Sequence, residues 1–121
     1  MTKPELFDTA ELLVDLPECN LRAGALGAIV HQHSDDMYEV EFVDEDGQTR
    51  AVCALSTQQF MIVWRHATQS WVPVPKQMAE LVSRLREPAR REVLDFARFL
   101  HARSAQEQAS RKEPAEKEVV R

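Results

Sequence analysis

The spacing of the apolar residues changes once along the 121 residues of this chain. Up to residue 64 they come in short runs, and residues 38–42 alternate between apolar and acidic side chains, as in a strand with one buried face. Beyond residues 71–75, which Pro73 and Pro75 interrupt, the apolar residues recur at helical spacing. The change of period predicts a small β unit followed by helices, a fold that is mainly β with α.

Five strands are expected before the proline-containing segment. Their ranges are 8–16, 26–33, 37–43, 50–55 and 60–64. A long first loop, a tight acidic hairpin and one helical turn at residues 56–59 complete the pattern of a small SH3-like, five-stranded barrel. The leucines of residues 8–16 also fit a helix, and this alternative stays open. A strand is favoured there because five strands close the sheet without an unpaired edge.

Two short helices, a helical hairpin, are expected after the linker. The first carries apolar residues at helical spacing from Met78, and the second begins near Glu87, with Pro88 at a position where a helix tolerates proline. The C-terminal residues carry no apolar stripe, which is typical of a disordered tail. The predicted boundaries are 1–66 for the barrel, 67–75 for the linker, 76–103 for a two-helix interaction module and 104–121 for a flexible tail.

The charge of the chain divides near the same point. Residues 1–75 hold four basic against twelve acidic side chains, a net charge of −8, whereas residues 76–121 hold eleven basic against eight acidic, a net charge of +3. A surface that binds nucleic acid needs basic side chains to neutralise phosphates. We therefore do not expect the barrel to bind nucleic acid.

Three stretches of the first half resemble a bacterial family of small, mostly uncharacterised SH3-like proteins. They are residues 6–17 (LFDTAELLVDLP), 21–31 (LRAGALGAIVH) and 38–49 (YEVEFVDEDGQT), and the resemblance spans about residues 5–64. It implies an SH3-like barrel that is often encoded next to toxin-like genes. It implies no catalytic residues.

The second half resembles the helical module of VapB-type antitoxins. The resemblance lies in residues 78–103 (MAELVSRLREPARREVLDFARFLHAR), above all in the run EVLDFARFL at residues 92–100. In that group the helices pack on a toxin, commonly a PIN-type ribonuclease. Residues 86–88 depart from the usual Leu-Pro junction, which leaves the start of the second helix open. The barrel stands where such antitoxins usually carry a DNA-binding domain.

Motifs for catalysis are missing from the sequence. His31 and His33 share one face of an expected strand, a spacing that can hold a metal, but two exposed strand histidines are the simpler interpretation. The acidic run at residues 44–46 lacks the alternating ligands of a calcium loop. No glycine-rich phosphate loop, GxSxG or HExxH motif is present. We expect no catalytic residue, no metal, no cofactor and no enzymatic activity.

Partner binding is the function that the pattern favours, through apolar residues that two short helices cannot bury alone. The predicted partner-binding residues are Leu81, Leu85, Val93, Phe96, Phe99 and Leu100. The expected partner is a toxin-like ribonuclease, which the chain would inhibit by covering it. Packing of the same residues on the barrel or in a homodimer is the alternative. A barrel that binds nucleic acid or a small ligand as a regulator is the alternative function.

A cytoplasmic location is expected. The N-terminus shows no basic stretch followed by a long apolar core, so no secretory signal is visible. The purely apolar runs are far shorter than the ~20 residues that span a bilayer, and no membrane association is expected. Cys19 and Cys53 lie outside any CxxC pattern and are expected to be reduced thiols, with a disulfide between them as the alternative.

Overall fold

The computed structural model describes residues 3–120, with side chains described as far as Arg111. The chain forms two compact units. The sheet unit is Met1–Glu80, and the helical unit is Leu81–Arg121.

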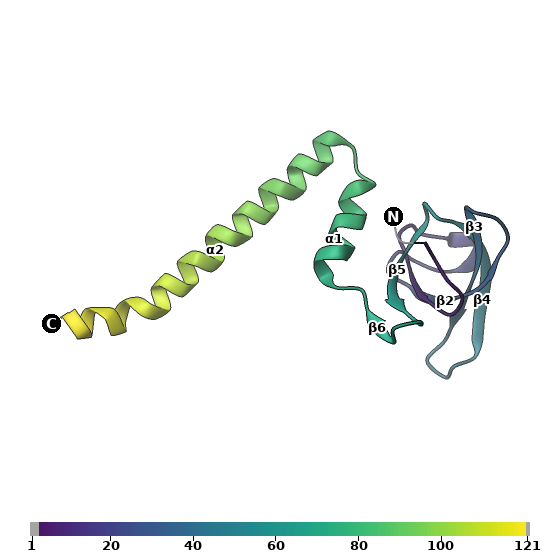
Figure 1. The fold of residues 1–121 in the computed structure, drawn as a ribbon, viewed down its shortest axis with the longest axis horizontal. Coiled ribbons are helices and arrows are strands. Elements are labelled where there is room, and N and C mark those ends of the chain that lie inside the picture. Colours follow the sequence, from purple (N-terminus) through teal and green to yellow (C-terminus); the bar gives the residue numbers. More distant parts are fainter. Residues whose placement is uncertain (1–2, 121) are drawn as a thin grey trace. The chain divides into compact units, whose positions relative to one another are not determined.

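Among the described residues, six antiparallel strands form one sheet. They are β1 (Thr9–Leu12), β2 (Leu26–Gln32), β3 (Met37–Val43), β4 (Thr49–Ser56), β5 (Phe60–Arg65) and β6 (Ser70–Trp71). Their order is β4-β3-β2-β1-β5-β6, so the first strand lies between β2 and β5 (Figure 1). A short 3-10 helix, η1 (Pro17–Cys19), lies in the long loop between β1 and β2. The expected fold class, mainly β with two helices after the sheet, is confirmed.

The first strand is shorter than expected. β1 ends at Leu12 instead of residue 16, and the chain then leaves the sheet. Asp15 Oδ1 accepts a hydrogen bond from the Ala23 backbone N–H at 2.9 Å, and Pro17 starts η1. These loop contacts replace strand pairing beyond Leu12. The alternative helix over residues 8–16 is wrong, because β1 occupies the first half of that range.

A sixth strand lies inside the segment 67–75 that was expected to be only a linker. Trp71 of β6 pairs with Trp64 of β5, and the Val72 N–H donates to the Val63 carbonyl at 2.8 Å. Two residues are too few to show an alternating pattern, so the sequence cannot reveal this strand. The hydrogen bonds tie the segment to the sheet, and the sheet unit accordingly continues into the first helix.

Residues 56–59 form a hydrogen-bonded turn instead of the expected helical turn. The Gln59 N–H donates to the Ser56 carbonyl at 2.9 Å, and the Gln59 side-chain Oε1 accepts from the Ser56 N–H at 2.9 Å. Ser56 itself is the last residue of β4. The Gln59 side chain therefore closes the turn by accepting from the Ser56 backbone.

The sheet is curved (Figure 1). Every strand from β1 to β5 contributes residues to one apolar core. Its buried members are Ala10, Leu12, Leu16, Leu21, Ile29, Tyr38, Val40, Phe42, Cys53, Leu55, Phe60 and Ile62. The strands β2 and β3 approach closely at Gly27, where a Cβ would lie 2.7 Å from Val40 Cγ1. Only glycine fits at this close approach.

A buried carboxylate fastens the N-terminal segment to the end of β5. The Asp8 side chain is 0% exposed. Its Oδ2 accepts hydrogen bonds from the Glu5 N–H and from Arg65 Nη1, both at 3.0 Å, and its Oδ1 accepts from the His66 N–H at 2.9 Å. Arg65 Nη1 also donates to the Lys3 carbonyl at 2.9 Å. A buried charge is stable when it is paired and hydrogen-bonded in this way.

Two helices follow the sheet, α1 (Val74–Ser83) and α2 (Glu87–Val120). α1 begins earlier than expected, with Pro75 in its first turn, where the missing N–H is not needed. α2 begins at Glu87 with Pro88 in its first turn, as expected. Pro75 and Pro88 therefore both lie at the starts of helices.

The second helix extends well beyond its expected end at residue 103. α2 continues to Val120 (Figure 1). Residues 104–113 are mostly Ala, Gln, Glu, Lys and Arg, which favour helix without any apolar pattern. Arg103 Nε and Glu107 Oε1 add an ion pair at 3.7 Å one turn apart. The segment predicted to be a tail thus belongs to α2 as far as Val120, and Arg121 lies outside the described residues.

Candidate functional site

The six residues predicted to bind a partner all lie in the helical unit. In chain order they are Leu81 in α1, Leu85 in the turn after it, and Val93, Phe96, Phe99 and Leu100 in the first half of α2. We call these six residues the helical stripe. The structure therefore brings all the predicted residues into one compact unit, and none of them belongs to the core of the sheet unit.

The α2 part of the helical stripe is open to solvent. Phe96 is 60% exposed and Phe99 is 56% exposed. Val93 is also exposed, and Leu100 is half-buried. Leu94, which lies beside Val93, is exposed as well. Contiguous apolar exposure of this kind marks an interaction surface more often than scattered single residues do.

The aromatic residues of the helical stripe form an ordered patch. Val93, Phe96 and Leu100 follow the i, i+3, i+7 spacing that places side chains on one side of a helix. The Phe99 ring lies beside the Phe96 ring, with centroids 6.1 Å apart and an interplanar angle of 25°. The guanidinium of Arg103 lies 5.9 Å from the centre of the Phe99 ring, a cation–π contact. The apolar patch from Val93 to Leu100 is therefore about two turns long, and Arg103 lies beyond its C-terminal end.

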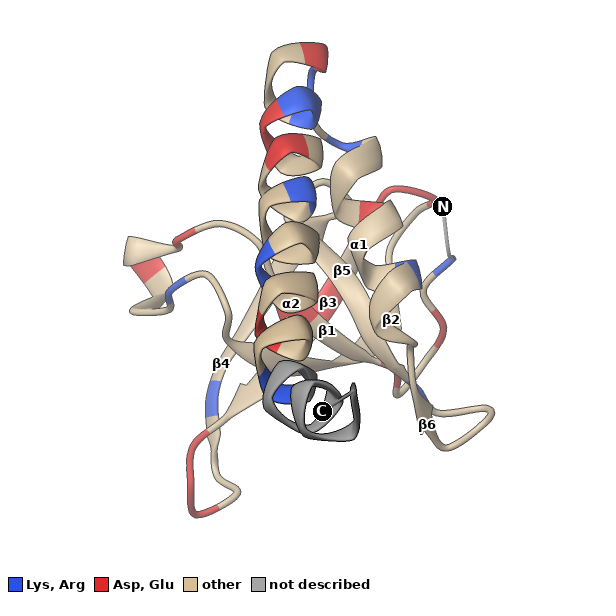
Figure 2. Cartoon of the chain, turned by 90° about the vertical axis from the view of Figure 1, so that its left-hand side faces the viewer, with Lys and Arg blue, Asp and Glu red and all other residues tan. Residues whose placement is uncertain are grey.

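The opposite side of α2 is charged. At 100° per residue, Glu87, Arg91, Asp95 and Arg98 lie on the side away from Val93. Arg91 pairs with Glu87 at 3.7 Å and Arg98 pairs with Asp95 at 3.4 Å. Figure 2 shows basic and acidic segments following one another along this helix. Charged side chains are favourably hydrated, so a partner that binds α2 would contact its apolar side.

Arg90 closes the corner between the two helices. Its Nε donates to the Val82 carbonyl and its Nη2 donates to the Ser83 carbonyl, both at 3.1 Å. Carbonyls at the C-terminal end of a helix have no partner within the helix, and a cation is favourable there. Arg90 therefore holds the end of α1 beside the start of α2. The sequence does not reveal this role, because an arginine seven positions beyond the end of α1 looks like any other solvent-exposed basic residue.

The two strand histidines lie side by side, as their spacing predicts. The rings of His31 and His33 have centroids 4.7 Å apart, and His33 Nε2 lies 3.0 Å from Glu39 Oε1 of the neighbouring strand. Among the side chains of residues 3–111, no group of three or more His, Cys, Asp or Glu is arranged to hold a metal ion. The geometry gives no support for a metal centre in this part of the chain.

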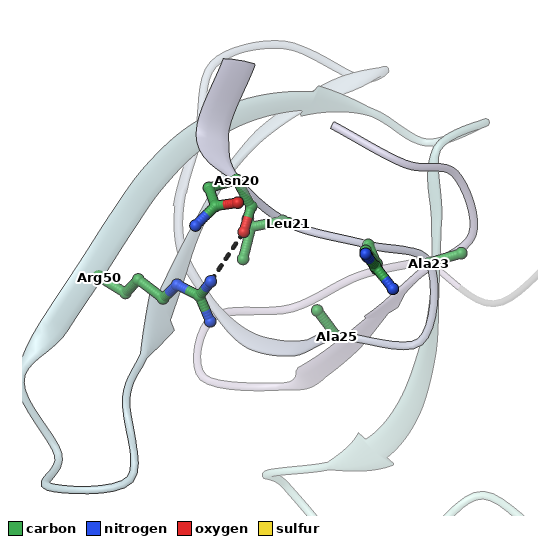
Figure 3. A pocket seen from close by; sticks show the side chains of 6 residues that line it. Asn20, Leu21, Ala23, Ala25 and Arg50 are labelled. Atoms are coloured by element: carbon green, nitrogen blue, oxygen red, sulfur yellow. Dashed lines mark hydrogen bonds between the residues drawn. The ribbon is translucent and has the colours of Figure 1, made fainter. Parts of the chain in front are cut away.

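A pocket of about 340 Å³ lies between the loop before β2 and the start of β4. Its lining residues are Asn20, Leu21, Arg22, Ala23, Ala25 and Arg50. Arg50 reaches across to the loop, where its Nη2 donates to the Asn20 carbonyl at 2.8 Å (Figure 3). Two of the four basic residues of positions 1–75, Arg22 and Arg50, thus line one pocket. No sequence pattern predicts this, because the two arginines are 28 positions apart.

None of the helices in the described part of the chain has both the length and the apolar content that crossing a membrane requires.

Comparison with known proteins bears on the sheet unit. Residues 6–62 match the family model described as "Domain of unknown function (DUF4926)". The match runs from the residues before β1 into β5 and includes neither α1 nor α2. Comparison with the curated proteins and with the solved structures found no match. The sheet unit is thus similar over most of its length to a family whose function is unknown.

Proposed function

We propose that the chain is a non-enzymatic, antitoxin-like inhibitor that docks the helical stripe on a protein partner. The observation that carries this proposal is the solvent exposure of Phe96 and Phe99, side by side on α2. Aromatic side chains are enriched among the residues that dominate protein–protein binding. An amphipathic helix that lays such a face into an apolar groove is a recurrent mode of recognition. The partner contributes the groove, and the helix contributes the aromatic anchors.

The charge of the sheet unit favours a basic partner. Residues 1–75 carry a net charge of −8. Asp44, Glu45 and Asp46 are exposed in the loop of the β3–β4 hairpin. Complementary potentials raise the rate of association and suppress wrong partners. A ribonuclease has a basic RNA-binding surface, and an acidic domain delivered to that surface by a docked helix would exclude RNA. Inhibition of this kind needs no chemistry from the chain itself.

A second copy of the chain is the competing partner for the helical stripe, and sedimentation distinguishes the two. We expect the purified chain to sediment as a monomer at micromolar concentrations, because the proposal assigns the helical stripe to a groove on a different protein. A dimer that dissociates when Phe96 is replaced by Asp would show that the stripe is a self-association surface. That result would contradict docking on a different protein.

The pocket at Arg22 and Arg50 favours a second function, binding of a small anionic ligand by the sheet unit. The two guanidinium groups provide several donors in the planar arrangement that matches phosphate and carboxylate oxygens. Arg50 uses Nη2 for the Asn20 carbonyl, which leaves other donors of its guanidinium for a ligand. The volume of about 340 Å³ falls within the range of small-molecule sites.

Inorganic phosphate is the probe for this pocket. We expect tens of millimolar phosphate, at matched ionic strength, to raise the melting temperature of the chain by a few degrees, because a ligand that binds only the folded state stabilises it. The rise is expected to disappear in Arg22→Ala/Arg50→Ala and to persist in Arg98→Ala, a change on the charged side of α2. Equal rises in all three proteins would show a general salt effect and would rule out the pocket.

A further inference from the structure

Two thiols from distant parts of the sequence lie in contact within the sheet unit. Cys19, at the end of η1, and Cys53, in β4, are 34 positions apart, yet their Sγ atoms are 2.9 Å apart. Both are free cysteines. A disulfide bond is about 2.05 Å long, so the two sulfurs need to approach by less than about 1 Å to be joined. The sequence alone leaves open whether Cys19 and Cys53 pair. The structure brings the two residues into contact as free thiols.

The backbone on both sides of the thiols is held in place. Arg50 of β4 donates to the carbonyl of Asn20, the residue that follows Cys19, at 2.8 Å. On the other side of η1, Leu16 and Leu21 form a two-residue antiparallel bridge, with the Leu16 N–H donating to the Leu21 carbonyl at 2.9 Å. The bridge closes the loop that carries Cys19, and the Arg50 hydrogen bond ties this loop to β4. The backbone contacts therefore hold Cys19 close to Cys53.

We propose that Cys19 and Cys53 are an oxidisable pair that closes to an intramolecular disulfide on exposure to a peroxide. This site concerns the sheet unit alone and does not depend on docking by the helical stripe. Closing the bond would cross-link η1 to β4 and join the two ends of a loop that includes β2 and β3. A link of this kind stabilises the folded state, mainly because it restricts the unfolded chain.

The two cysteines differ in their access to an oxidant, which sets the order of the chemistry. Cys19 is half-buried, whereas Cys53 is buried, and burial together with the neighbouring Cys19 thiol raises the pKa of Cys53 to about 11. Cys53 is therefore a thiol at neutral pH and a poor first nucleophile. The Cys19 thiolate attacks hydrogen peroxide, an S–O bond forms as the O–O bond breaks, and the leaving hydroxide takes up a proton as water.

The second step consumes the Cys53 thiol. Its sulfur attacks the Cys19 sulfenic acid, the S–S bond forms as the S–O bond breaks, and the hydroxyl leaves as water with the Cys53 proton. In sum, two thiols and one hydrogen peroxide give one disulfide and two waters. Peroxide is reduced, and the two sulfurs are oxidised.

Peptide mapping of the peroxide-treated full chain without reductant tests the proposal. We expect a peptide pair that joins Cys19 to Cys53, an intact mass lower by two hydrogens, and a melting temperature higher by on the order of 10 °C, all reversed by dithiothreitol. The variant Cys19→Ser should keep the sheet unit folded and show neither the mass loss nor the thermal shift. Because replacement of buried Cys53 can itself unfold the sheet, mapping of the unsubstituted chain is the primary readout. Sulfinic acids or intermolecular dimers in place of the joined peptides would overturn the proposal.

Discussion

Phe96→Asp is expected to weaken the binding of a protein partner by about 30-fold or more, because truncation of an aromatic anchor commonly removes more than ~2 kcal/mol of binding free energy. The Phe96 side chain is 60% exposed in the chain alone, so it is available to a partner. A carboxylate in its place would enter an apolar groove without a counter-ion, which is strongly unfavourable. Isothermal titration of the partner that copurifies with the chain measures the change in Kd.

Ala105→Asp is the matched control for this substitution. Ala105 is exposed in the same helix, and at 100° per residue it lies about 120° or more from every α2 member of the helical stripe. Both variants add one negative charge to α2, and the control lowers helix propensity at least as much, because alanine is a better helix former than phenylalanine. We expect Ala105→Asp to change the Kd by less than about threefold, since surface substitutions have small effects. Equal losses in the two variants would show that charge or helix stability, and not the aromatic anchor, governs binding.

Asp8→Ala is expected to lower the free energy of unfolding of the sheet unit by about 3–5 kcal/mol, the usual effect of removing one partner of a buried ion pair. The Asp8 carboxylate is fully buried and accepts three hydrogen bonds, two from backbone N–H groups and one from Arg65. The Glu5 and His66 N–H groups lose this acceptor when the carboxylate is removed, whereas Arg65 keeps the Lys3 carbonyl. Proteins of this size are stable by roughly 5–15 kcal/mol, so the loss would be a large part of the total.

Tryptophan fluorescence in urea measures this loss in the relevant unit, because Trp64 and Trp71 lie in β5 and β6. Asp15→Ala is the control. Asp15 is exposed and accepts a single hydrogen bond, from the Ala23 N–H at 2.9 Å, so we expect a change of about 1 kcal/mol or less. Coincident unfolding midpoints for Asp8→Ala and the unsubstituted chain would mean that the buried network contributes nothing to stability.

The elements with a long, regular apolar pattern could be predicted from the sequence. Residues 37–43 alternate over a whole strand, and β3 has those bounds in the structure. The helical spacing from Val93 to Leu100 likewise predicts the α2 part of the helical stripe, whose exposure the structure then shows. β6 escaped prediction because two residues carry no period. The length of α2 escaped prediction because its later residues favour helix by propensity alone, without an apolar face.

Contacts between distant residues could not be predicted, because nothing in a single sequence joins them. Asp8 and Arg65 are 57 positions apart, and each alone resembles ordinary surface charge. Cys19 and Cys53 match no spacing motif. In the pocket, Arg50 comes from β4, whereas the other lining residues come from the loop before β2. The fold brings these groups together by strand pairing. Patterns that repeat along the chain are readable from it, whereas pairs that meet across the sheet need the structure.

The ribonuclease activity of the protein that copurifies with the chain from its native host tests the docking proposal most directly. We expect cleavage of a labelled RNA by that protein to fall to background when one equivalent of the chain is added. The same inhibition is expected from Ala105→Asp, and almost none from Phe96→Asp at the same concentration. A copurifying protein that does not cleave RNA, or inhibition that is the same with Phe96→Asp as with the unsubstituted chain, would contradict the proposal.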